Sequence, residues 1–180
     1  MKKILIVSAS MRKGGNSDIL ADEFQRGAVE SGNDVEKINL FDKCIGFCKG
    51  CLACQSTRNC VIQDDANTIV EKMLHADVLV FATPIYFYEM CGQMKTLLDR
   101  TNPLFPADYS FRDIYLLTAS ADTDPASMDG AVKGLQGWLD CFEKTRLAGI
   151  VRGVGATKPG DIKKFDSLLQ EAYQMGKSIK

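Results

Sequence analysis

The chain has 180 residues, of which 46% are hydrophobic and 25% charged, and its formal net charge is -1. These values are ordinary for a globular protein, so we expect a single domain over residues 1–180. The near-neutral net charge gives no excess of positive charge with which to bind nucleic acid. No apolar stretch approaches the roughly 20 residues that span a membrane. Because the N-terminus lacks the apolar region of a signal peptide, we expect a cytoplasmic protein.

Short apolar runs alternate with helical patterns along the chain. The runs that predict strands are, in chain order, 4–7, 35–40, 78–82, 114–118 and 149–154. The apolar spacing predicts helices over about 17–30, 65–74, 90–98, 128–142 and 162–173. In the first of these helices we expect an inward-facing stripe of Ile19, Leu20, Phe24 and Ala28. We expect the third strand to stop at Thr83-Pro84. The alternation predicts an α/β fold: a doubly wound, five-stranded parallel sheet in the order 2-1-3-4-5, with helices on both faces.

A polar loop follows the first predicted strand and leads directly into a helix. Ser10, Asn16 and Ser17 supply hydroxyl and amide groups to this loop, and Arg12 supplies positive charge. Together with the free N–H groups of a helix N-terminus, these residues favour the binding of a phosphate. The sequence contains neither the G-x-G-x-x-G dinucleotide pattern nor a P-loop. An ordinary strand-to-helix turn would, however, contain the same residue types.

An aromatic segment, Thr83-Pro84-Ile85-Tyr86-Phe87-Tyr88, follows the third predicted strand. In a sheet of order 2-1-3-4-5, the strand order reverses between strands one and three, and ligands of such sheets bind at this point. The polar loop and the aromatic segment would therefore flank one crevice, the first binding a phosphate and the second offering a flat apolar surface to a planar ring. The alternative is that the aromatic rings pack against a neighbouring helix or subunit.

Three motifs in the chain resemble those of the flavodoxin-like NADPH-dependent FMN reductases. They are Ser8-x-Ser10-x-Arg12-x3-Asn16-Ser17, Thr83-Pro84-Ile85-Tyr86-Phe87 and Gly92-Gln93-Met94-Lys95-x3-Leu98-Asp99-Arg100. The resemblance implies a flavodoxin-like fold, non-covalent FMN, NAD(P)H as electron donor and a homodimer or homotetramer. Carried over by position, it implies an FMN site composed of Ser10, Arg12, Asn16 and Ser17 at the phosphate, Pro84, Ile85, Tyr86 and Phe87 at the ring, and Ser120, Ala121 and Asp122 in a third loop.

Four of the seven cysteines form one C-x2-C-x2-C-x5-C run, Cys48, Cys51, Cys54 and Cys60, within a cysteine-rich loop at about 44–60. Such compact spacing allows one loop to surround an inorganic cluster. The run also resembles the cysteine motif of the iron–sulfur flavoproteins, which implies a [4Fe–4S] cluster held by these four thiolates. Zinc is an alternative, although zinc sites usually combine two separated pairs, often with histidine, and His75 is the only histidine here. Free thiols are the third alternative.

The function that these features predict is an FMN-dependent oxidoreductase. A reduced nicotinamide or a protein donor would load the flavin, and a small molecule or a protein would accept the electrons. No side chain stands out as a nucleophile or general base. One alternative is an electron carrier that turns over no small substrate, which steady-state NAD(P)H oxidation would distinguish. Another is a redox sensor that acts through its cysteines, for which flavin-free protein with reversible thiol oxidation would be evidence.

Overall fold

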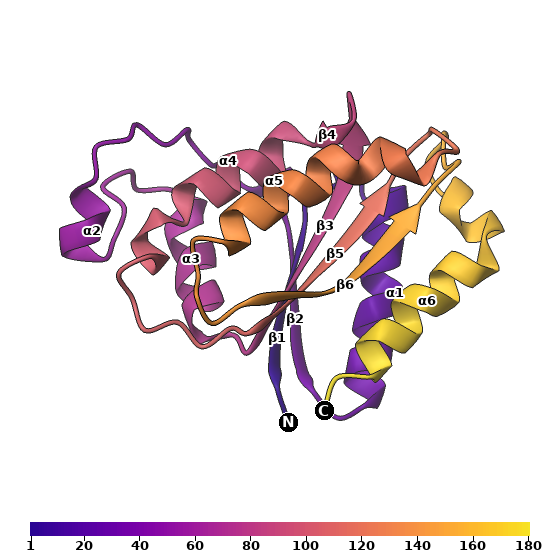
Figure 1. The fold of residues 1–180 in the computed structure, drawn as a ribbon, viewed down its shortest axis with the longest axis horizontal. Helices are drawn as coiled ribbons and strands as arrows, with labels where there is room; N and C mark the ends of the chain where they lie inside the picture. Colours follow the sequence, from indigo (N-terminus) through magenta and orange to yellow (C-terminus); the bar gives the residue numbers. More distant parts are fainter.

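The computed structural model describes residues 1–180, and it shows a twisted sheet with helices on both faces (Figure 1). The strands are β1 (Lys3–Ser8), β2 (Asp34–Asn39), β3 (Val78–Tyr86), β4 (Glu89–Met90), β5 (Asp113–Ala119) and β6 (Arg146–Gly153). The α-helices are α1 (Asn16–Glu30), α2 (Ala53–Thr57), α3 (Asp65–His75), α4 (Gly92–Arg100), α5 (Asp129–Leu139) and α6 (Asp166–Lys177). Four short 3-10 helices are η1 (Leu40–Asp42), η2 (Asn102–Leu104), η3 (Pro125–Met128) and η4 (Asp161–Lys164).

The sheet confirms the α/β class and corrects the predicted strand arrangement. Its strand order is β2-β1-β3-β5-β6, and each neighbouring pair along this path is parallel. The expected five strands in the order 2-1-3-4-5 are wrong, because the sheet has a sixth strand, β4, off this path. After β3 the chain turns back on itself, so that Ile85 pairs with Met90 and Tyr86 with Glu89 in an antiparallel ladder. Two residues of such a ladder are too few to be recognised from a pattern of alternation.

β3 also continues past the predicted stop at Thr83-Pro84. Pro84 lies opposite Ala119 in the parallel ladder between β3 and β5. On the other side of β3, pairing with β1 ends at Ala82. Beyond Ala82, that side of β3 no longer pairs with β1 and is an edge of the parallel sheet. Pro84 has no N–H group, and at this edge none is needed to pair with β1. The extension carries Ile85 and Tyr86 beyond the parallel part of the sheet, to where β3 pairs only with β4.

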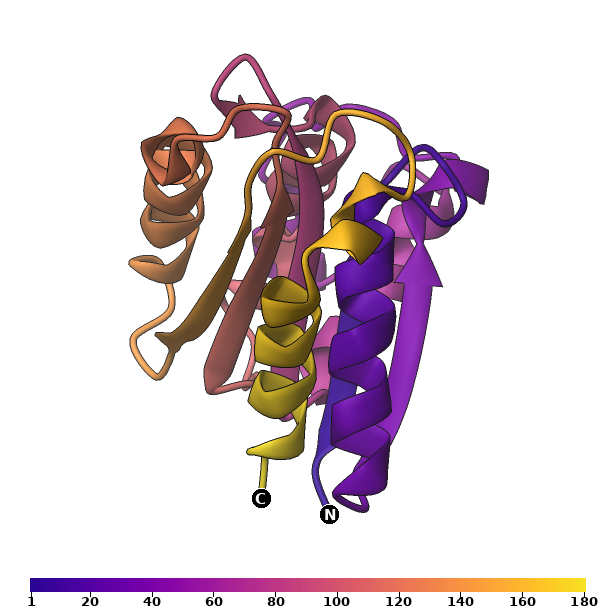
Figure 2. The ribbon, with the colours of Figure 1, turned by 90° about the vertical axis from the view of Figure 1, so that its right-hand side faces the viewer.

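The two faces of the sheet are covered by different helices (Figure 2). One face packs against α1 and α6, and the other against α3, α4 and α5. The predicted inward stripe of α1 is buried as expected and consists of Ile19, Leu20, Phe24 and Ala28. Helices α1 and α6 pack closely because glycines stand at their crossing. A Cβ atom on Gly27 would lie 2.0 Å from the Tyr173 carbonyl oxygen, and one on Gly176 would lie 2.1 Å from that of Phe24.

The parallel strands bring four loops to one edge of the sheet, at the carboxyl ends of β1, β3, β5 and β6. The cysteine-rich loop follows β2 and η1 and contains α2, which lies at the end of the molecule away from α6 (Figure 1). None of the helices has both the length and the apolar character needed to cross a membrane.

Candidate functional site

A crevice opens at the carboxyl edge of the sheet, where segments distant in sequence come together. It is lined by Ser10, Arg12, Gly15, Asn16, Ser17, Pro84, Ile85, Tyr86, Ala119, Ala121, Ala156, Thr157 and Pro159. The polar loop after β1, the end of β3 and the loop after β5 therefore surround one space, as the sequence predicts. The fourth wall, residues 156–159 after β6, was not predicted.

The polar loop is built around the N-terminus of α1. Gly15 is the N-cap residue, and no side chain caps the helix, so its first N–H groups remain available to a ligand. The hydroxyl of Ser10 donates to the Arg12 carbonyl oxygen at 2.8 Å, and the Gly15 N–H donates to the same oxygen at 2.9 Å. A Cβ atom on Gly15 would lie 2.4 Å from the Ser10 Oγ, so this turn requires glycine.

Ser17 contributes a hydroxyl group to the crevice that no other group of the protein contacts by a hydrogen bond. Its side-chain oxygen is buried, yet it has no hydrogen-bond partner. A buried polar atom without a partner costs free energy, and an acceptor placed at the helix N-terminus would satisfy the Ser17 hydroxyl and the free N–H groups together. The side chain of Arg12, which is exposed, supplies positive charge beside this position. These residues fit the phosphate of FMN.

Asn16 lines the crevice, but its side chain is engaged elsewhere. Its Nδ2 donates to the carbonyl oxygens of Ala156 at 2.9 Å and Lys158 at 3.0 Å, and its Oδ1 accepts from the Ile162 N–H at 3.2 Å. The side chain thus fastens the loop after β6 onto the start of α1. Its amide group is not free to bind a phosphate in the way that the sequence predicts, and its contribution to the crevice is to hold this fourth wall.

A buried charge network lies behind the polar loop. The Asp18 carboxylate accepts from the Ser8 hydroxyl at 2.8 Å, from the Gly14 N–H at 3.0 Å and from the Lys37 Nζ at 3.1 Å. Lys37 also pairs with Asp22. Burial lowers the pKa of Lys37, but the hydrogen bonds to Asp22 and Asp18 outweigh it and raise the pKa above its usual value. Lys37 therefore remains charged and neutralises the carboxylates beside the anion site.

Pro84, Ile85 and Tyr86, which the sequence assigns to the ring of FMN, line the crevice. Phe87 does not, because its side chain is 101% exposed at the tip of the β3–β4 hairpin. Phe87 and its neighbour Tyr88 have left-handed backbone angles, with φ of 51° and 64°. Such angles are strained for aromatic residues, and neither residue lines the crevice of this chain.

The third predicted loop contributes unequally. Ala121 lines the crevice, whereas Ser120 and Asp122 do not. The Ser120 side chain is buried and accepts from the Asp122 N–H at 3.1 Å, and the Asp122 carboxylate accepts from the Tyr88 hydroxyl at 3.4 Å. The Ser120 carbonyl oxygen also accepts from the Ala156 N–H at 2.9 Å. Ser120 and Asp122 therefore shape the loops after β5 and β6.

The cysteine-rich loop, called the thiol loop below (residues 44–60), does not gather its thiols. Cys48 and Cys51 are exposed, Cys60 is half-buried and Cys54 is buried. The Cys54 Sγ accepts from the Asn102 Nδ2 at 3.1 Å. No three Cys, His, Asp or Glu side chains lie together as a ligand set for one metal ion. The donor chemistry fits a cluster, but this arrangement does not, and ligation of one would require Cys54 to turn outward.

The thiol loop is fixed to the rest of the chain by a buried ion pair. The Arg100 guanidinium donates to both carboxylate oxygens of Asp64, at 2.6 and 3.0 Å. Burial lowers the pKa of Arg100, but the hydrogen bonds and charge of Asp64 outweigh it and raise the pKa. Burial conversely raises the pKa of Asp64, and the bonds from Arg100 and the Gly46 and Ala66 N–H groups outweigh it, so this pKa lies below its usual value. The pair is charged at neutral pH.

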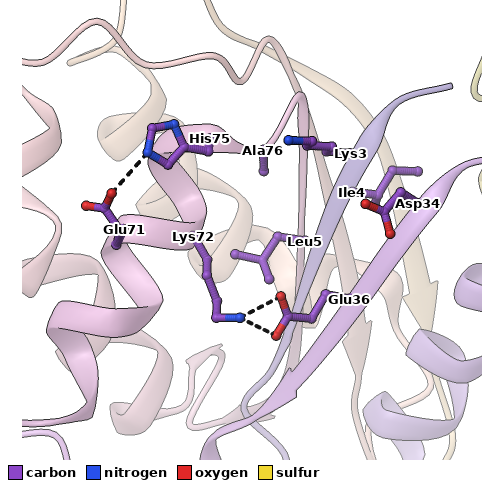
Figure 3. A pocket seen from close by; sticks show the side chains of 9 residues that line it. All are labelled: Lys3, Ile4, Leu5, Asp34, Glu36, Glu71, Lys72, His75 and Ala76. Carbon is purple, nitrogen blue, oxygen red and sulfur yellow. Dashed lines mark hydrogen bonds and ion pairs between the residues drawn. The ribbon is translucent and has the colours of Figure 1, made fainter.

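A second hollow lies at the opposite, amino-terminal edge of the sheet, between β1, β2 and the end of α3 (Figure 3). Four of its polar side chains are paired with one another. The Lys72 Nζ lies 2.7 and 2.8 Å from the two carboxylate oxygens of Glu36, and the His75 Nε2 lies 3.0 Å from the Glu71 Oε1. None of the predicted site residues lines it, so we assign it no part in the chemistry.

The parallel sheet, with its crevice at the carboxyl edge between β1 and β3, defines a flavodoxin-like α/β protein. A solved structure of the same fold is the NAD(P)H:quinone oxidoreductase from Methanothermobacter marburgensis, with a TM-score of 0.75. It is 16% identical, and the match covers 98% of this chain and 94% of that one. The sequence also matches the NADPH-dependent FMN reductase family over residues 2–149, and the chain belongs to this family.

Two curated relatives show how far the similarity extends. The Bacillus subtilis protein YwqN, to which an NAD(P)H-dependent FMN-containing oxidoreductase activity is provisionally assigned, is 31% identical, with 96% of each chain covered. An iron–sulfur flavoprotein of Methanocaldococcus jannaschii is 37% identical over 102 residues, which are 57% of this chain and 53% of that protein. The match to the iron–sulfur flavoprotein thus spans about half the length of that relative.

Proposed function

We propose that the chain is an FMN-dependent oxidoreductase that takes electrons from NAD(P)H and passes them to a small-molecule or protein acceptor. The observation that carries this proposal is the buried, unpartnered Ser17 hydroxyl at the uncapped N-terminus of α1, inside a crevice bounded by four loops. Membership of the NADPH-dependent FMN reductase family supports the cofactor and the donor.

In this proposal the protein binds and orients the flavin, which supplies the electron-transfer chemistry when bound. Ser17 and the first N–H groups of α1 hold the phosphate, and Arg12 offsets its charge. Ser10 joins them only if its hydroxyl turns from the Arg12 carbonyl oxygen to the phosphate. Pro84, Ile85 and Tyr86 hold the ring and exclude water from one side of it. Asn16 acts by holding the loop of Ala156 against the crevice.

The test is to purify the protein and measure FMN per chain, its absorption spectrum, and the steady-state oxidation of NADPH and NADH with a quinone or free flavin as acceptor. The expected result is one FMN per chain and turnover of at least one nicotinamide. FMN that is reduced only by a protein donor, with no nicotinamide turnover, would favour the electron carrier. Flavin-free protein with reversible thiol oxidation would favour the redox sensor.

For the thiol loop, we propose that Cys48, Cys51, Cys54 and Cys60 ligate a [4Fe–4S] cluster after the loop rearranges. The support is their spacing and the chain's similarity to an iron–sulfur flavoprotein, which is 37% identical over 102 residues. Anaerobic reconstitution with iron and sulfide tests this, with zinc measured in parallel. Fewer than about two irons per chain, or iron content unchanged in a variant with Cys51→Ser and Cys54→Ser, would reject the cluster. Zinc bound instead, or thiols left free, would establish the corresponding alternative.

We also propose a homodimer or homotetramer, in which a second copy covers the exposed hairpin tip. Tyr86, Phe87 and Tyr88 are 49%, 101% and 64% exposed. Three neighbouring aromatic side chains at this exposure form an apolar patch of the kind that marks an interaction site. The partner would then complete the wall of the crevice beside Tyr86, which lies both in the patch and in the crevice.

A further inference from the structure

The Arg100 side chain donates hydrogen bonds to the backbone on both sides of the cysteine motif. Arg100 is the last residue of α4, and its side chain has no exposed surface. Its Nη1 donates to the Gly46 carbonyl oxygen at 2.8 Å, and its Nη2 donates to the Ile62 carbonyl oxygen at 3.0 Å. Gly46 precedes the first cysteine of the motif and Ile62 follows the last. One guanidinium group therefore closes the segment that contains all four thiols.

The N-terminus of α3 completes this closure. Asp64 caps α3 by accepting from the Ala66 N–H at 3.0 Å, and it accepts from the Gly46 N–H at 2.8 Å. Next to it, the Asp65 carboxylate accepts from the Cys44 N–H at 2.7 Å, and the Asp65 N–H donates to the Cys44 carbonyl oxygen at 3.2 Å. All of these contacts are made by protein groups alone, so the base of the loop is held without any metal.

The same stretch of chain also holds the middle of the loop. Asn102, two residues after Arg100, donates to the Cys54 Sγ and keeps this thiol buried. The Arg100 Nε is buried and has no hydrogen-bond partner, and Arg100 and Cys60 line one cavity. Arg100 therefore retains an unused N–H donor at the base of the thiol loop.

Helix α4 connects this closure to the flavin crevice. It follows the β3–β4 hairpin, which contributes Ile85 and Tyr86 to the crevice, and it ends at Arg100. Nine residues of α-helix span about 13 Å. A side chain fixed at the far end of this helix holds the thiol loop at a set place relative to the crevice.

We propose that Arg100 is the positioning residue of the thiol loop: it holds the loop closed, with Cys54 turned inward, and so fixes the thiols relative to the flavin crevice. This inference rests on the proposed function only in taking the thiols as the metal-binding or redox-active groups. The planar guanidinium group of Arg100 is essential for holding the loop closed. A lysine would provide a charge but could not bond to Gly46, Ile62 and Asp64 together.

The test is the alkylation rate of each cysteine in the folded, chelator-treated protein, measured by mass spectrometry after timed exposure to iodoacetamide. Cys91 is buried outside the loop and serves as an internal reference, because only wider unfolding exposes it. In the Arg100→Lys variant, the ratio of the Cys54 rate to the Cys91 rate is expected to rise at least about tenfold, since local opening frees the loop alone.

The matched control is Asn33→Ala, which removes buried hydrogen bonds to the Ala28 and Ile179 carbonyl oxygens away from the loop. It should lower stability and leave the Cys54-to-Cys91 ratio unchanged. A ratio that is equally unchanged in Arg100→Lys would overturn the proposal. If that variant does not fold, Asp64→Asn is measured in the same way, with the same two outcomes. Because the readout uses metal-free protein, a wild type that binds no iron or no FMN leaves this test intact.

Discussion

The side-chain amide of Asn16 donates to the carbonyl oxygen of Ala156 at 2.9 Å, although the two residues are 140 positions apart. This bond joins the start of α1 to the loop after the last strand, and it belongs to a set of three made by the one side chain. The crevice is therefore closed on its fourth side by a residue that the sequence assigns to the phosphate. Whether Asn16 holds the loop of Ala156 or binds the phosphate of FMN directly can be measured.

Replacing Asn16 with Ala should weaken FMN and riboflavin binding to a similar degree. The variant loses three hydrogen bonds, so the free energy of unfolding should fall by about 1–3 kcal/mol and the wall of the crevice should loosen. Urea unfolding and flavin fluorescence titrations measure the two effects. Asn59→Ala, at an exposed site in the thiol loop, is the control. A loss confined to FMN would instead assign Asn16 to the phosphate.

Replacing Ser17 with Ala should give the opposite pattern. The Ser17 hydroxyl has no partner within the protein, so its removal costs the apo protein little and should even relieve an unsatisfied group. A hydrogen bond to a charged phosphate is lost, which should weaken FMN binding by about tenfold and leave riboflavin binding unchanged. Comparable losses for both ligands would show that the phosphate lies elsewhere.

The ion pair of Asp64 and Arg100 should make stability sensitive to acid. The pKa of Asp64 is lowered in the folded protein, whereas in the unfolded chain it is about 3.9. Its contribution is therefore fully present above about pH 4, and it is lost as the pH falls through the lower, folded pKa. Urea unfolding of the wild type should show the free energy of unfolding falling as the pH is lowered from neutral to below about 4.

The Asp64→Asn variant should have a flatter dependence on pH over the same range, because it has no carboxyl group to protonate. At neutral pH it leaves Arg100 buried without a counter-charge, which should cost about 3–5 kcal/mol. Asp108→Asn, which removes an exposed partner of Lys144, should change neither the stability nor its pH dependence appreciably. Equal pH profiles for the wild type and Asp64→Asn would mean that this carboxyl group does not titrate differently on folding.

The sequence predicted the parts of the fold that depend on local periodicity. The stripe Ile19, Leu20, Phe24 and Ala28 was assigned correctly because a helix spaces its buried residues regularly. The extension of β3 past Pro84 was missed because it depends on where the neighbouring strand β1 stops, which is not a local property. The β4 strand was missed because its two residues carry no pattern of their own.

The sequence predicted the positions of the loops that follow strands. It predicted less well which hydrogen-bond partners individual side chains in those loops would have. Ser10, Ser17 and Pro84 line the crevice, and the sequence assigned them to it from their residue types, their places after strands and the family resemblance. The loop at Ala156–Pro159 could have been found by the same rule, because it also follows a parallel strand at the carboxyl edge. The partners of Asn16 and the inward position of Cys54 depend on residues more than 40 positions away, which spacing does not reveal.

The exposed hairpin tip provides the last prediction, which concerns assembly. Phe87 is 101% exposed with a strained left-handed backbone, and a single chain gives it no contact that would offset this strain. If a second copy covers the tip, Phe87→Ser should shift the protein toward the monomer and weaken FMN binding, because the partner also covers the crevice beside Tyr86. Light scattering and flavin titration at several protein concentrations measure both effects. Phe105→Ser, at a 56% exposed site outside the hairpin, is the control and should leave both unchanged. A wild type that remains monomeric with FMN bound would rule out this assembly.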